Sequence, residues 1–139
     1  MRQALHLLNI QTKGKGLVEI TAQVSAWVAE QKIATGLLTI FCRHTSASLL
    51  IQENADPDVQ MDLESFFDEI APEDGKRYVH RTEGLDDMPA HIRTALSQTQ
   101  LAVPIASGRM VLGTWQGIYL FEHRCAPHRR EIVLQLLGE

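Results

Sequence analysis

Seven strand-type segments run through this chain, and they do not alternate with helices in the βαβα order of a parallel sheet. Residues 36–44, GLLTIFCRH, are apolar on both faces up to Arg43, which is typical of a central strand. Further strand-type segments cover residues 3–10, 17–20, 45–54, 101–105, 109–124 and 130–137. The pattern predicts an α+β fold over residues 1–139, a single compact domain of mostly antiparallel sheet or sandwich with about three helices on one side.

Three helices are expected between these strands. Thr21 is a candidate cap for the first, and the pair Asp56-Pro57 is a strong start signal for the second. In the second helix, the apolar positions recur at helical spacing: Val59, Leu63, Phe66, Phe67 and Ile70. The third helix is expected from about Met88 to Ser97, with four inward positions: Met88, Ile92, Ala95 and Leu96.

Composition limits the classes of function. The formal net charge of −4 argues against a nucleic-acid partner. The chain has two cysteines, Cys42 and Cys125, and therefore no CxxC motif or disulfide framework. The start of the sequence does not resemble a signal peptide, and no apolar run is long enough to cross a bilayer. We therefore expect a cytoplasmic protein without a membrane partner.

Three histidines, His44, His80 and His91, each lie at the end of an element or beside a turn, where side chains can converge. Imidazole is a usual ligand of zinc and similar ions, and three protein ligands plus water make an open catalytic site. The spacing of ten residues between His80 and His91 matches no local metal motif. A structural role for each histidine, without a metal, therefore stays an alternative.

Polar residues also gather in HTSASLLIQENADPD, residues 44–58. Thr45 and Ser46 follow His44, but no GxSxG motif supports a serine hydrolase, and hydrogen bonds to a ligand or the backbone are the better explanation. Three further polar groups precede the second helix: Glu53, Asn54 and Asp56. Asp56 has the plain alternative of being only the helix cap.

A third candidate segment is SGRMVLGTWQGI, residues 107–118. Gly108 lets backbone amides approach an anion, and Arg109 supplies a charged, bidentate fork. Thr114 and Gln116 lie between two glycines that leave room for a ligand. Glu122 ends an otherwise apolar strand face. It is a candidate ligand, or a candidate carboxylate that hydrogen-bonds to a ligand.

Taken together, HTSASLLIQENADP, HRTEGLDDMPAHI and GRMVLGTWQGIYLFEHR resemble the YjbQ-like family along essentially the whole chain. The resemblance implies a compact α+β fold, a homotrimer, and a polar pocket near a subunit boundary with a metal or anion bound by histidines. It also implies thiamine-phosphate synthase activity, described as secondary. By this resemblance His44, His80 and His91 are metal or catalytic positions, with zinc or magnesium as the expected divalent ion.

The remaining positions follow from the same match and from the residue types. Catalytic roles are expected for Glu53, Asp56, Arg109 and Glu122, and substrate or anion contacts for Thr45, Ser46, Asn54, Thr114 and Gln116. The expected partner is a small phosphorylated metabolite, used in a thiamine-phosphate synthase-like transfer. Two alternatives use the same residues: a metal-dependent hydrolase of such a metabolite, and a non-catalytic module that binds it.

Overall fold

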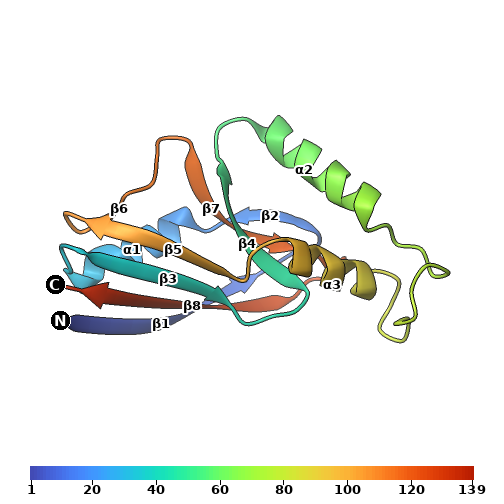
Figure 1. Ribbon diagram of the computed structural model, residues 1–139, viewed down its shortest axis with the longest axis horizontal. Coiled ribbons are helices and arrows are strands. Elements are labelled where there is room, and N and C mark those ends of the chain that lie inside the picture. Colours follow the sequence, from blue (N-terminus) through green and yellow to red (C-terminus); the bar gives the residue numbers. More distant parts are fainter.

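Two antiparallel sheets form the framework of the computed structural model, which describes residues 1–139 (Figure 1). The larger sheet has the strand order β1 (Arg2–Gln11), β8 (Arg129–Gly138), β3 (Gly36–Cys42), β5 (Gln100–Ala106) and β6 (Arg109–Met110). The smaller sheet has the order β2 (Gly16–Glu19), β7 (Gln116–Glu122) and β4 (Ala47–Glu53). Every pairing is antiparallel, so the predicted fold class is confirmed.

Strand β3 is central, as its apolar sequence predicts. It pairs with β8 on one side and β5 on the other, so that Leu38 lies opposite both Leu136 and Val103. Alternate residues point to opposite faces of a strand, and Leu38 and Ile40 enter the core. The core lies between the larger sheet and a second layer formed by the smaller sheet and helix α1 (Thr21–Gln31).

The other face of the larger sheet has no covering layer. Five large apolar side chains on it are exposed: Leu5, Leu7, Leu37, Phe41 and Leu137. They come from strands β1, β3 and β8, which are neighbours in the sheet. All three helices therefore lie on the opposite side of this sheet, in agreement with the sequence prediction.

Helices α2 (Pro57–Ile70) and α3 (Asp87–Leu96) cover the smaller sheet from outside (Figure 1). Asp56 caps α2 by accepting a hydrogen bond from the amide of Asp58 at 2.9 Å, and Pro57 is its first residue. Phe67 packs edge-on against Phe121 of β7, with ring centroids 5.3 Å apart. No residue of α2 is fully buried, so this helix is attached by one partly covered face.

The inward face predicted for α3 is wrong in its second half, while Met88 and Ile92 are partly buried as expected. Ala95 is exposed and Leu96 is 60% exposed, whereas the buried residues of the helix include Ala90, Arg93 and Thr94. The reason is that α3 meets polar partners: Arg93 donates to Asp68 at 2.9 Å and to the Ala71 carbonyl at 3.0 Å. Apolar periodicity alone does not detect a face that is buried through hydrogen bonds.

Two further expectations are corrected. Residues 109–124 are not one strand, because β6 belongs to the larger sheet and β7 to the smaller one. The chain changes sheets through residues 111–115, where the Gly113 amide donates to the Gln116 side chain at 2.8 Å. Thr21 is the first residue of α1 and not its cap; its hydroxyl accepts the amide of Ile118 at 2.8 Å.

Candidate functional site

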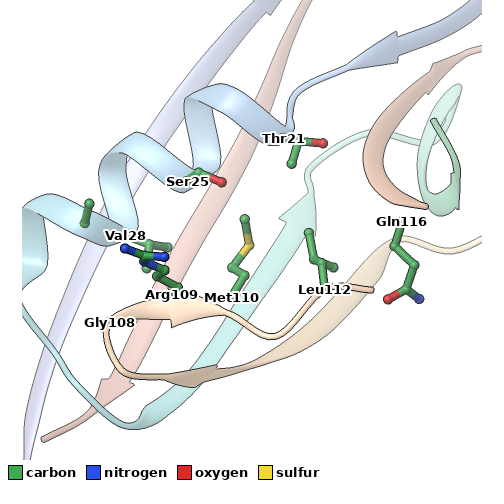
Figure 2. Close-up of a pocket in the computed structure, with 9 residues that line it drawn as sticks. Thr21, Ser25, Val28, Gly108, Arg109, Met110, Leu112 and Gln116 are labelled. Carbon is green, nitrogen blue, oxygen red and sulfur yellow. The ribbon is translucent and has the colours of Figure 1, made fainter. Parts of the chain in front are cut away.

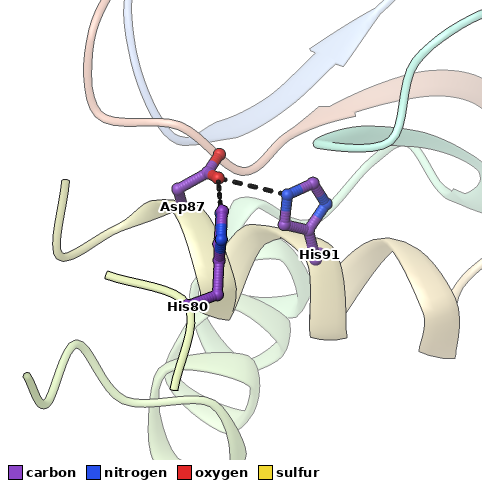
Figure 3. A group of neighbouring side chains, drawn as sticks. All are labelled: His80, Asp87 and His91. Atoms are coloured by element: carbon purple, nitrogen blue, oxygen red, sulfur yellow. Dashed lines mark hydrogen bonds and ion pairs between the residues drawn. The ribbon is translucent and has the colours of Figure 1, made fainter. Parts of the chain in front are cut away.

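Three side chains meet where α3 begins: His80, Asp87 and His91 (Figure 3). The Nε2 atoms of His80 and His91 lie 2.7 and 3.1 Å from the same carboxylate oxygen, Oδ2 of Asp87. Asp87 and His91 are four residues apart on the helix and so share one face. The Asp87 side chain is 7% exposed, while those of His80 and His91 are 41% and 34% exposed. This group, the histidine–aspartate trio, thus has a buried carboxylate and two histidines that face solvent.

A fixed tautomer follows from the other contact of His91. Its Nδ1 atom lies 2.9 Å from the carbonyl oxygen of Thr45, which can only accept, so Nδ1 carries a hydrogen. In the neutral ring the Nε2 lone pair then faces Asp87 Oδ2, and two acceptors oppose each other at 3.1 Å. This contact becomes favourable only when a proton or a metal ion lies between the two atoms.

Arg124 binds the oxygen of Asp87 that does not face the histidines. It donates to Asp87 Oδ1 at 2.8 Å and to Asp86 Oδ2 at 2.9 Å, and so anchors the first turn of α3. Burial alone raises the pKa of Asp87, but the hydrogen bond from His80 and the charges of His91 and Arg124 outweigh it. The pKa of Asp87 therefore lies below its ordinary value, and Oδ2 is available as an anionic ligand.

The donor set fits a divalent ion of the zinc type. The three ligand atoms lie within 4.8 Å of one another. Zinc bonds of about 2.1 Å in tetrahedral geometry place ligand atoms roughly 3.4 Å apart, so small side-chain rotations suffice. Two imidazoles and one carboxylate favour zinc over magnesium, which prefers oxygen ligands. The Thr45 carbonyl would serve as the outer hydrogen-bond partner that orients a ligating histidine.

His44 is not part of the trio. Its Nε2 atom accepts the backbone amide of Glu131 at 2.7 Å, so the lone pair of this nitrogen is already used. Burial and the charge of Arg130 lower the pKa of His44. His44 nevertheless lies next to the trio along the chain, because Thr45 supplies the carbonyl that holds His91.

The predicted residues Glu53, Asn54 and Asp56 form the turn between β4 and α2. Glu53 accepts the Asp56 amide at 2.9 Å, and the Asn54 amide donates to the Trp115 carbonyl at 3.0 Å. Asp56 is the helix cap described above, which is the plainer of its two predicted roles. These contacts explain the turn, and the catalytic roles of Glu53 and Asp56 stay predictions.

Arg109 and Gln116 line a cleft of about 440 Å³ between α1, β6 and the 111–116 segment. Arg109 lies at one end of this cleft and Gln116 at the other (Figure 2). Thr114 is exposed in the same segment. Strand β6 and helix α3 lie at opposite ends of the molecule, so the structure does not bring Arg109 to the trio within one chain (Figure 1).

Glu122 lies in a buried ion pair, at the base of a small pocket of about 160 Å³ beside Arg93 and Phe121. It is fully buried and accepts from Arg130 Nε at 2.9 Å and from the Thr12 hydroxyl at 2.6 Å. Burial raises the pKa of Glu122, but the hydrogen bonds from Arg130 and Thr12 outweigh it and hold the pKa below its ordinary value. The predicted ligand residue Ser46 belongs to the same group, since its hydroxyl accepts Arg130 Nη2 at 3.0 Å.

A buried chain of hydroxyls on the outer face of the smaller sheet was not detected in the sequence. Ser97 Oγ contacts the Arg93 carbonyl and Ser48 Oγ, both at 2.6 Å, and Ser48 Oγ lies 2.8 Å from His123 Nε2. Three contacts need three hydrogens, which the two hydroxyls and the ring supply, so Nε2 of His123 carries one. Burial lowers the pKa of His123 to about 3, and its Nδ1 atom has no partner.

The sequence interpretation also missed Asp87 as a member of the trio. The signal was present: in DDMPAHI, Asp87 precedes His91 by four residues, which places both on one helical face. It was lost because the helix was expected to begin at Met88, one residue too late.

The geometry defines a small α+β protein with a histidine–carboxylate centre at the start of a helix. Comparison with known families gives the class: residues 6–139 match the model of the UPF0047 protein YjbQ-like family. The chain belongs to this family.

Similar proteins agree with this assignment over nearly their whole length. The UPF0047 protein sll1880 of Synechocystis is 56% identical over 99% of this chain and 94% of its own. The UPF0047 protein YjbQ of Escherichia coli O157:H7 is 41% identical over 95% of this chain and 96% of its own.

Solved structures of similar proteins confirm the fold. The crystal structure of an uncharacterized conserved protein of the YjbQ/UPF0047 family from Clostridium acetobutylicum has a TM-score of 0.88 at 34% identity, covering 95% of this chain and 99% of that one. A conserved hypothetical protein from Thermus thermophilus has a TM-score of 0.84 at 35% identity, with the same coverage. None of the helices in this chain has the length and apolar character needed to span a membrane.

Proposed function

We propose that this protein binds a zinc-type divalent ion at the histidine–aspartate trio and uses it on a small phosphorylated compound. The observation that carries the proposal is the convergence of His80 Nε2, His91 Nε2 and Asp87 Oδ2, with the His91 tautomer fixed by Thr45. Three protein ligands leave a coordination position open, and the histidines face solvent. An open position supports an enzyme over a purely binding module.

For the reaction, we propose a thiamine-phosphate synthase-like transfer, which joins a pyrimidine pyrophosphate to a thiazole phosphate and releases pyrophosphate. When bound, the ion would supply positive charge for the leaving pyrophosphate. Within the chain, Asp87 and His91 would hold the ion on one helical turn, and Arg124 keeps Asp87 ionised and oriented. Arg109 belongs to β6, which lies at the opposite end of the molecule from α3, so it does not share this task within one chain.

Hydrolysis of a phosphorylated metabolite is the second candidate, favoured by the solvent-facing side of the trio. One assay separates the two reactions. The metal-loaded protein is incubated with the pyrimidine pyrophosphate alone and with both substrates. Transfer requires both compounds and yields thiamine phosphate, whereas hydrolysis releases phosphate from the single compound.

The metal is tested first, by elemental analysis of purified, untagged protein. We expect about one zinc per wild-type chain and its loss in Asp87→Asn and His91→Ala. His6→Gln is the matched control, because His6 stacks on Trp27 of α1, away from the trio. Zinc that persists in Asp87→Asn and His91→Ala, or that is lost equally in His6→Gln, would remove the basis of this proposal.

A homotrimer is part of the same proposal. The uncovered face of the larger sheet supports it, since contiguous exposed apolar side chains commonly mark an interface between subunits. Light scattering coupled to size-exclusion chromatography measures the mass directly. A mass of three chains is expected for wild type, and a lower mass for Leu37→Lys.

A further inference from the structure

A second cleft lies directly beside the trio, at the end of β3. It has a volume of about 390 Å³ and is lined by Phe41, Cys42, Arg43, His44, Thr45 and Thr99. Thr45 connects the two places: it lines this cleft, and its carbonyl accepts the hydrogen bond that orients His91. A ligand in the cleft would therefore lie next to an ion in the trio.

The polar groups of this cleft are mainly donors. No carboxylate lines it, whereas Arg43 contributes a guanidinium and Thr45 and Thr99 contribute hydroxyls. The guanidinium makes one protein contact, from Nη1 to Glu131 at 3.2 Å, so its other N–H groups are free. An excess of donors over acceptors is the chemistry that binds an oxyanion.

His44 adds a donor whose direction is fixed. Because Nε2 accepts the Glu131 amide, the neutral ring carries its hydrogen on Nδ1. No acceptor in the protein takes this hydrogen. The same bond argues against His44 as a metal ligand, since the lone pair of Nε2 is already used and Nδ1 is protonated.

We propose that this cleft binds the phosphate group of the ligand, with Arg43, Thr45 and the Nδ1–H of His44 as its donors. The inference rests on the proposed function for the choice of a phosphorylated ligand, but the anion site is defined by residues outside the trio. Phe41, which is 44% exposed, provides an apolar wall for the remainder of the ligand. His44 then acts on the substrate and not on the metal.

The test measures binding of inorganic phosphate by titration calorimetry, together with zinc content, for the wild type and for His44→Gln and His44→Asn. The Gln amide oxygen can replace Nε2 and keep the Glu131 contact, but it leaves no donor at the Nδ1 position. We expect His44→Gln to keep its zinc and to bind phosphate about tenfold more weakly, the value of one hydrogen bond to an anion. His44→Asn, whose amide N–H can replace Nδ1, should lose less affinity.

Arg43→Gln should weaken phosphate binding at least as much, because it removes a charge. Arg77→Gln is the control for net charge, since Arg77 is exposed and its side chain makes no hydrogen bond or ion pair. Phosphate binding that is unaffected by His44→Gln and Arg43→Gln, or no binding to wild type, overturns the anion site. Loss of zinc in His44→Gln also overturns it and restores His44 as a ligand. If wild type lacks zinc but His44→Gln weakens phosphate binding, the anion site stands and the metal proposal fails.

Discussion

Glu122 and Asp87 are both carboxylates held by an arginine, but their surroundings differ. Glu122 is fully buried, and both of its oxygens are occupied by donors from Arg130, Thr12 and the backbone. Asp87 has one oxygen satisfied by Arg124, while the other faces two imidazole nitrogens at an opening to solvent. A carboxylate with all its acceptors filled stabilises the fold, and one with an acceptor left for an incoming cation is available for chemistry.

The largest loss of stability is expected from the buried Glu122–Arg130 pair. Arg130→Met leaves Glu122 as a buried charge without its cationic partner, and we expect a loss of about 3–5 kcal/mol in the free energy of unfolding. Urea denaturation measures it. Arg43→Met, which breaks the exposed pair with Glu131, should cost less than about 1 kcal/mol. Equal losses in the two variants would contradict the structural importance of the buried Glu122–Arg130 pair.

The histidine–aspartate trio should make the stability of the protein depend on metal. Zinc at about 100 times its Kd should stabilise the wild type by about 2.7 kcal/mol, because it binds only the folded chain. The measurement is urea denaturation with zinc and with a chelator. His80→Ala should be nearly as stable as wild type in the chelator and gain little from zinc; a full gain would show that the ion binds elsewhere.

The buried histidine should make stability depend on pH. The pKa of His123 is about 3 in the folded chain and lies near 6.5 when unfolded, so below pH 6.5 the unfolded chain binds the extra proton. Stability should fall as pH decreases from 6.5 to 5, with a slope of at most about 1.4 kcal/mol per pH unit from this group. His44, whose pKa is also lowered, acts in the same direction.

The slope is read from unfolding titrations at pH 7, 6 and 5, a range above the ordinary pKa of carboxyl groups. In His123→Gln, whose amide can still donate to Ser48, the slope should become smaller. An unchanged slope would mean that the pKa of His123 is not lowered in the folded state.

The smallest expected effect comes from the hydroxyl chain. Ser97→Ala removes one contact to Ser48 and one to the Arg93 carbonyl and should cost about 1 kcal/mol. Ser65→Ala, on the exposed side of α2, should stay within about 0.5 kcal/mol of wild type. A null effect of Ser97→Ala would mean that water replaces the lost hydroxyl.

The sequence was informative where apolar patterns decide structure. The two-faced apolar run at 36–42 predicts the central strand β3, and the Asp56-Pro57 signal predicts the start of α2. It was less informative about α3, which is buried through Arg93 and Ser97, because hydrogen-bond partners distant in sequence leave no periodic pattern.

The site shows the same limit. His80 and His91 converge as predicted, since both flank one short segment. His44 and Glu122 do not join them: the first is held by Glu131 and the second by Arg130, from strand β8, near the far end of the chain. Residue types identify candidate ligands, but only the register of β8 decides which of them are already occupied.

The four-residue spacing of Asp87 and His91 has a consequence for how the chain folds. Starting a helix is its costly step, because several residues must be ordered before the first hydrogen bond forms. An ion bridging Asp87 and His91 would cross-link one turn of α3 and remove much of that cost locally. We therefore expect a peptide of residues 85–98 to gain helicity on adding zinc, and the metal supply to influence the rate of refolding as well as the final stability.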